Sequence, residues 1–207
     1  MTRSGAFALA VGLVVPIVAC QRQESRTTET AVEATLASDV ASSVPESTAA
    51  AYDLQFLDSM SKHHQMAIDM AKQGHDKFMH AELKEMAKRM VEDQEREIAQ
   101  MKQWRDQWYP GAAPADSTQM PGTASMNMDM THMQMAIRHT RRPGKQLDLM
   151  FIEMMIPHHQ GAIEMARDAM AKAEHQEIKD LVQKMIPEQQ KEIDQMKEWK
   201  TQWSTEK

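Results

Sequence analysis

The side chains best suited to chemistry in this sequence are imidazoles and thioethers, which occur together twice. The two groups are Met60, His63, His64 and Met70, and Met155, His158, His159 and Met165. In each group the first methionine lies three residues before the first histidine and the second lies seven residues after it, so all can share one side of a helix. Thioether with imidazole favours Cu(I), and methionine keeps its soft sulfur where thiols would oxidise. Each group is therefore a candidate Cu(I) site.

A third set of soft ligands lies between these two groups. It comprises five methionines and one histidine within ten residues, namely Met126, Met128, Met130, His132, Met133 and Met135. Their spacing does not follow a single helical period, so some of them must be exposed on any helix. This pattern favours a separate, more exposed Cu(I) site that feeds or supplements the other two. The alternative is a linker without a role in metal binding.

Structural roles compete with metal binding at every one of these positions. Methionine on a helix face is usually core filling, and a buried histidine is often purely structural. Adjacent histidines lie about 100° apart around a helix, so we expect one of each pair to face inward and the other to flank it. The inward histidine could donate to Gln94 or Glu97, or to their counterparts Gln189 and Glu192, which could equally support a metal-binding imidazole. The 21 methionines in 207 residues favour metal binding.

Other kinds of chemistry find less support in the sequence. A ferritin-type di-iron centre needs Glu-x-x-His pairs on facing helices, whereas Asp58 and Glu153 each lie five residues before a histidine pair. No Ser-His-Asp spacing, phosphate-binding loop or CxxC motif is evident, so we do not expect an enzyme. With 30 acidic and 24 basic residues, the chain also has nothing that attracts nucleic acid.

The elements that must position the histidines are duplicated. Residues 56–108 and 151–203 align without a gap at an offset of 95 residues, with 23 identities in 53 positions. Each copy has two runs of apolar residues at helical spacing, and Gly74 is placed to end the first helix of copy one. Each copy is therefore an antiparallel helical hairpin whose apolar stripe the other copy can cover. The expected fold is an all-α, ferritin-like four-helix bundle built from two duplicated hairpins, residues 52–109 and 145–207.

The rest of the chain is expected to connect or tether these hairpins. Residues 110–144 form a Met-rich linker, in which a turn-rich loop over 109–125 precedes the methionines. Copy two carries Pro157 and Pro187 where copy one has no proline, so we expect kinks or breaks near Ile156 and Ile186.

The N-terminal segment reads as an export signal. Residues 1–19 hold an apolar run too short for a comfortable membrane span, and the run ends at Cys20, the single cysteine, in a context that resembles a bacterial lipobox. We expect lipid on Cys20 and a disordered tether over residues 20–51, which is poor in aromatic and large aliphatic residues. The alternative is an ordinary signal peptide with an incidental thiol.

The histidine motif resembles a known family. Both copies follow the pattern Phe-Leu/Ile-x-x-Met-x-x-His-His-Gln-x-Ala-Ile-x-Met-Ala and then Gln-x-x-Glu-Ile-x-x-Met-x-x-Trp, which resembles the family called domain of unknown function 305. This resemblance implies a ferritin-like helical fold and periplasmic copper binding through Met and His, with the eight motif residues above as ligands. Copy one lacks the usual proline before the His pair and has Met66 where a small residue is common, so copy two is closer to the family pattern.

The sequence thus predicts a lipid-anchored protein of the bacterial envelope, facing the periplasm or the exterior. It would bind Cu(I) for sequestration, resistance or delivery to a copper-handling protein. The alternatives are a ferritin-like metal oxidase, and a structural or interaction bundle that binds no metal.

Overall fold

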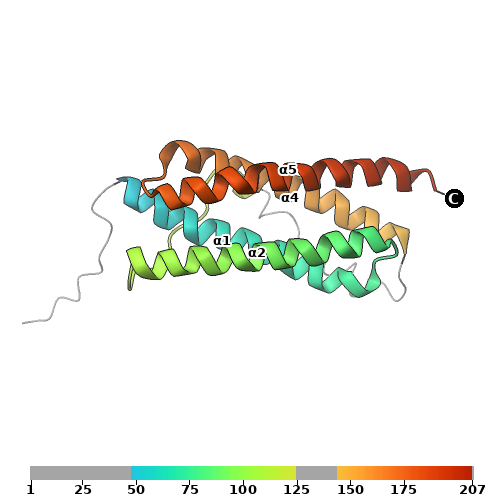
Figure 1. Cartoon of the computed structure of the whole chain (residues 1–207), viewed down its shortest axis with the longest axis horizontal. Coiled ribbons are helices and arrows are strands. Elements are labelled where there is room, and N and C mark those ends of the chain that lie inside the picture. Colours follow the sequence, from blue (N-terminus) through green and yellow to red (C-terminus); the bar gives the residue numbers. More distant parts are fainter. Residues whose placement is uncertain (1–47, 125–143, 207) are drawn as a thin grey trace, which may run out of the picture. The chain divides into compact units, whose positions relative to one another are not determined.

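The computed structural model describes residues 48–124 and 144–206. They contain four long helices, α1 (Thr48–Gly74), α2 (Ala81–Trp108), α4 (Lys145–Lys172) and α5 (Gln176–Ser204), with a short 3-10 helix η1 (His75–Lys77) after α1 (Figure 1). All four long helices belong to one compact unit, Val40–Lys207. No strand occurs in the described part of the chain, so the all-α prediction is confirmed.

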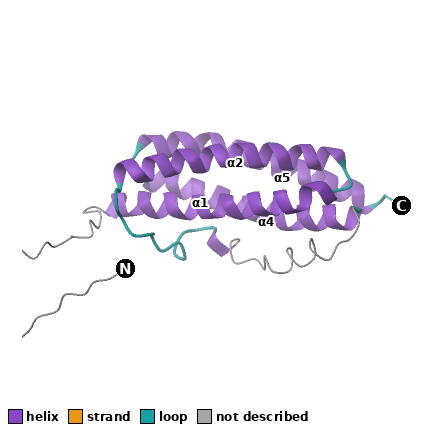
Figure 2. Cartoon of the chain, turned by 90° about the horizontal axis from the view of Figure 1, so that it is seen from below, coloured by secondary structure: helices purple, strands orange, loops and turns teal. Residues whose placement is uncertain are grey.

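The helices form two hairpins that pack against each other. The α1–α2 and α4–α5 pairs are each antiparallel, and the two hairpins meet mainly where α1 packs on α4 (Figures 1 and 2). The bundle of two duplicated hairpins is therefore as predicted. None of the described helices has an apolar stretch long enough to cross a membrane.

The ends of the helices follow the sequence closely, with one difference. Helix α1 ends at Gly74, as predicted. This residue must be glycine because a Cβ here would clash with the ring of Phe78, which is fully buried. Copy two has alanine at both equivalent positions, Ala169 and Ala173. The Cβ of Ala169 is accommodated there because Ala173 is much smaller than Phe78. Residues 109–122 contain no helix, as predicted. Helix α1, however, begins at Thr48, inside the segment predicted to be a disordered tether.

The predicted breaks at the two prolines are wrong. Helix α4 runs through Pro157 and α5 through Pro187 without interruption. Each proline removes one backbone donor, and the carbonyl groups that lose this donor belong to Glu153 and Gln183, which are exposed residues where water can replace it. The remaining hydrogen bonds and the packing of both helices hold the conformation.

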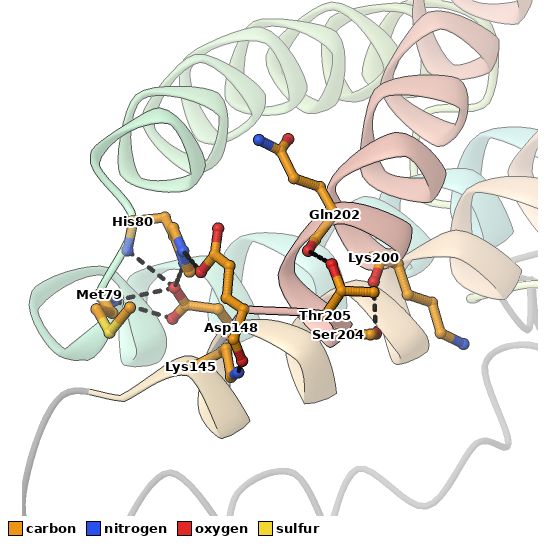
Figure 3. Close-up of polar contacts among 9 residues, drawn as sticks. Met79, His80, Lys145, Asp148, Lys200, Gln202, Ser204 and Thr205 are labelled. Carbon is orange, nitrogen blue, oxygen red and sulfur yellow. Dashed lines mark hydrogen bonds and ion pairs between the residues drawn. The ribbon is translucent and has the colours of Figure 1, made fainter.

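Each hairpin is joined to the other by a buried aspartate. Asp148 on α4 accepts hydrogen bonds from the backbone N–H of Met79 (3.0 Å) and His80 (2.9 Å), just before α2, and contacts His80 Nδ1 at 2.6 Å (Figure 3). The imidazole of His80 stacks on Trp203 with 3.7 Å between ring centroids. The carboxylate thus holds the start of a helix in the other repeat, where negative charge is favourable.

The equivalent contact is present on the opposite side of the bundle. Asp53 on α1 accepts hydrogen bonds from the backbone N–H of Glu174 (3.0 Å) and His175 (2.9 Å), just before α5. His175 stacks on Trp108, again with 3.7 Å between ring centroids. The first helix of each repeat therefore fixes the second helix of the other.

We expect Asp148→Ala to lower the free energy of unfolding by about 1–3 kcal/mol, because it leaves two partly buried backbone donors at the start of α2 without their acceptor. Urea unfolding measures this change. Asp194→Ala is a suitable control, since Asp194 is exposed and accepts only from Gln190 within its own helix, and it should change stability by less than about 0.5 kcal/mol. Equal unfolding midpoints for Asp148→Ala and the parent would contradict this role.

Candidate metal centre

The histidines of both motifs lie together in the middle of the bundle. His63, His64, His158 and His159 are all at most 1% exposed, and we call them the histidine layer. The rings of His63 and His158 meet between α1 and α4, with 3.7 Å between their centroids. The prediction that one histidine of each pair would only flank the interior is therefore incomplete, because all four are buried. One histidine of each pair faces the other repeat, and the second faces its own hairpin.

The histidines that face their own hairpin are held by carboxylates, one of the two kinds of partner that the sequence offered. His64 Nε2 lies 2.6 Å from Glu97 Oε2 on α2, and His159 Nε2 lies 2.7 Å from Glu192 Oε2 on α5. Since each carboxylate accepts, Nε2 carries the proton and Nδ1 of a neutral ring keeps its lone pair. The Nδ1 atoms of His64 and His159 are buried and have no hydrogen-bond partner. A carboxylate on one ring nitrogen and a free lone pair on the other is the arrangement found for histidines that bind metal.

The other two histidines are held in the neutral form. Burial lowers the pKa of His63 and of His158 well below the ordinary value of 6.5, and the neighbouring imidazoles lower it further. A protonated imidazole cannot bind a metal ion, whereas a neutral one can. His63 and His158 are therefore in their ligand form at neutral pH.

The four candidate methionines of the two motifs are buried next to the layer, in two apolar clusters. Met60 shares one cluster with Met165, and Met70 shares the other with Met155. Each apolar cluster thus contains candidate methionines from both copies of the repeat. The residue spacing within one copy could not predict that methionines of both copies would share a cluster.

A small cavity of about 20 Å³ lies beside the layer. It is lined by residues that are equivalent in the two repeats, namely Met90 and Met185, Asp93 and Glu188, Gln94 and Gln189, and Glu97 and Glu192. A cavity of this size has room for about one water molecule or ion. Met90 and Met185 were not among the candidate ligands, because methionine on the second helix suggested core filling. Their identity at the repeat offset was the signal that could have singled them out.

The donor types in this region limit what a site can contain. Among residues 48–124 and 144–206, no three side chains of His, Cys, Asp or Glu lie close enough together to hold one metal ion. A site at the histidine layer must therefore draw on thioether or amide groups as well. The candidate ligands Met126, Met128, Met130, His132, Met133 and Met135, and the lipidation site Cys20, lie outside the described residues.

Comparison with known proteins identifies the family. The model of a domain of unknown function, DUF305, matches residues 16–105 and 53–200. The chain belongs to the DUF305 family. The second match spans most of both copies, and the resemblance drawn from the sequence is confirmed. No curated protein matches the chain.

Several solved structures share this fold. CopM in its Cu(I)-bound form is 38% identical, with a TM-score of 0.58, and the match covers 73% of this chain and 96% of CopM. CopM in its Cu(II)-bound form is 37% identical, with a TM-score of 0.60, over 73% of this chain and 97% of CopM. A DUF305 protein from Streptomyces coelicolor, described as secreted, is 26% identical with a TM-score of 0.65, over 75% of this chain and 94% of that protein.

Proposed function

We propose that this protein binds copper at the histidine layer, through imidazole nitrogens and the thioethers of the adjoining clusters. The observation that carries the proposal is the pair of buried Nδ1 atoms of His64 and His159, which have no partner while a carboxylate orients each ring. Leaving buried polar atoms without partners is unfavourable unless a ligand satisfies them. CopM, a relative solved with Cu(I), Cu(II) and Ag bound, supports copper as that ligand.

The surroundings of the layer favour Cu(I) as the bound form. Neutral imidazole and thioether are ligands that suit this soft ion. The apolar clusters also favour a single positive charge over a double one, because burying charge without compensation is costly. We propose that the methionines Met60, Met70, Met155 and Met165 supply the sulfur ligands, with Met90 and Met185 as further candidates from the cavity wall. The 126–135 segment would be a second, more exposed Cu(I) site that loads the layer.

In the cell this binding would lower the free copper concentration or deliver the ion to a copper-handling partner. Neither role needs a catalytic step. Export to the envelope is supported by the apolar N-terminal run that ends at Cys20, and by the relative from Streptomyces coelicolor that is described as secreted.

Metal competition tests the proposal. We expect the purified mature protein to retain Cu(I) and Ag(I) against a competing chelator, and to release Zn(II) and Fe(II) under the same conditions. Inductively coupled plasma analysis after gel filtration gives the metal content. A protein that retains no copper would contradict the proposal, and oxygen consumption by an iron-loaded sample would favour the metal oxidase instead.

The lipid anchor has its own test. We expect the Cys20→Ser variant to move from the membrane fraction to the soluble envelope fraction, because lipid on Cys20 would be the attachment to the membrane. Fractionation and immunoblotting of cells that express the full chain measure this shift. A variant that stays with the membranes as the parent does would exclude Cys20 as the anchor.

A further inference from the structure

At the seam between α2 and α5, the two helices make fewer close contacts with each other than the other neighbouring helices of the bundle do. Close packing joins α1 to α2, α4 to α5 and α1 to α4. Between α2 and α5 lie grooves of about 530 Å³ and about 260 Å³, and the small cavity beside the histidine layer. Asp93 and Glu188, which occupy equivalent positions in the two repeats, line all three. The seam therefore gives solvent a route toward the histidine layer.

The innermost part of this route is strongly acidic. Asp93, Glu97, Glu188 and Glu192 line the small cavity, and no basic side chain among the described residues lines it. Lys184 and Lys191 lie only on the outer grooves, and Arg96 forms an ion pair with Asp93. Partial burial and the nearby carboxylates Glu97, Asp93 and Glu192 raise the pKa of Glu188. Carboxylates placed together repel one another, and a bound cation would relieve this repulsion.

Two amide side chains provide an independent indication of a ligand. Gln94 and Gln189 are 4% and 5% exposed, line the same cavity, and have Oε1 atoms without a hydrogen-bond partner. Amide and carboxylate oxygens are the donors that hard cations prefer. Glu97 and Glu192 also line the cavity and contact His64 and His159. The cavity thus lies directly between the seam and the histidine layer.

We propose that the α2–α5 seam is a cation-capture site, which takes a hydrated metal cation through carboxylate and amide oxygens and passes it to the histidine layer. The second half of this proposal rests on the proposed function, whereas the first half does not. The carboxylates do not converge on one point, so the ion keeps part of its water shell there. They act mainly by raising the local cation concentration, which accelerates association.

Mn²⁺ tests capture independently of copper, because it prefers oxygen ligands and broadens NMR signals of nearby groups. In the parent, Mn²⁺ should broaden the side-chain amide signals of Gln94 and Gln189 first. Asp93→Asn/Glu188→Gln should weaken Mn²⁺ binding at least about tenfold. The matched control is Asp69→Asn/Glu164→Gln, which removes the same charge from equivalent, exposed positions of α1 and α4 and should bind Mn²⁺ as the parent does.

Ag(I) tests entry, because it resembles Cu(I) but needs no reductant. Its arrival can be followed in a stopped-flow instrument by quenching of tryptophan fluorescence, since Trp199 lines the larger groove. We expect Asp93→Asn/Glu188→Gln to slow association about tenfold in dilute buffer, and the difference to disappear in concentrated sodium nitrate.

The outcomes separate the two proposals. Unchanged Mn²⁺ binding in the seam variant, or an equal loss in the control, would overturn the capture site. Weakened Mn²⁺ binding with unchanged Ag(I) association would overturn the entry role. A parent that binds Mn²⁺ at the seam but takes up neither Ag(I) nor Cu(I) would contradict the proposed function and leave the capture site supported.

Discussion

Replacing His64 and His159 together with glutamine should lower the affinity for Cu(I) by at least about 100-fold. Both Nδ1 atoms are buried without a partner, and the substitution removes both lone pairs. The glutamine amide can still donate to Glu97 or Glu192, so the contact that each histidine makes with its own hairpin is preserved in kind. Loss of a group that supports a metal ligand costs about 10–100-fold in affinity, and loss of the ligands themselves should cost more. Competition with a chromogenic Cu(I) chelator measures the change.

The matched control is His80→Gln/His175→Gln. It removes the same number of imidazoles from another pair of equivalent positions. These two histidines lie outside the motifs, and each ring stacks on a tryptophan. Circular dichroism must show that all variants keep their helix content. Equal Cu(I) affinity of the parent and the His64→Gln/His159→Gln variant would contradict binding at the layer.

The same assay addresses the relative weight of the two copies. The sequence favours copy two, which is closer to the family pattern, so His158→Gln/His159→Gln should cost more affinity than His63→Gln/His64→Gln. The structure instead gives a reason for equal losses of affinity from the two variants, because His63 and His158 lie against each other in a single layer. Equal losses from the two variants would remove the proposed asymmetry and favour one shared site.

The sequence predicted features that depend on spacing within one repeat. The helical hairpin follows from apolar periodicity, and the contacts of His64 with Glu97 and of His159 with Glu192 follow from residues that face each other inside a hairpin. Duplication then predicted that each hairpin covers the other. These parts of the fold and the site could be predicted because each is determined by residues that are close in the sequence.

Contacts between the repeats could not be predicted in the same way. Nothing in the spacing shows that Asp53 fixes the start of α5 or that Asp148 fixes the start of α2. Similarly, the pairing of Met60 with Met165 depends on how α1 crosses α4. Asp53 and Asp148 are identical residues at the repeat offset of 95, as are Met60 and Met155, and Met70 and Met165. The signal was therefore present, but it gave no geometry. The predicted breaks at Pro157 and Pro187 are absent because a local rule was outweighed by the packing of α4 and α5 and by solvent access to the freed carbonyls.

The metal-free protein should lose stability steeply as the pH falls below about 6.5. The pKa of His63 and of His158 is lowered well below 6.5 in the folded state, chiefly by burial, whereas in the unfolded chain both have ordinary values near 6.5. Below this pH the unfolded chain binds two protons that the folded protein does not. Stability therefore rises with pH across this window and falls on acidification, by about 1.4 kcal/mol per pH unit for each histidine. The two together give at most about 2.4 kcal/mol between pH 6 and pH 5, because the unfolded imidazoles are only about three-quarters protonated at pH 6.

Urea unfolding of the metal-free parent and of His63→Gln/His158→Gln at pH 7.5, 6 and 5 measures this effect. The carboxylates and the other histidines are the same in both proteins, so the difference between the two pH dependences isolates the two buried rings. The variant should be less stable than the parent at pH 7.5, because its amides are poorly matched to the site, but it should lose less stability on acidification. Parallel curves for the two proteins would show that the fold does not hold these rings neutral. In that case the two rings would become protonated on acidification as in the unfolded chain, and the layer would lose its neutral imidazole ligands below about pH 6.5.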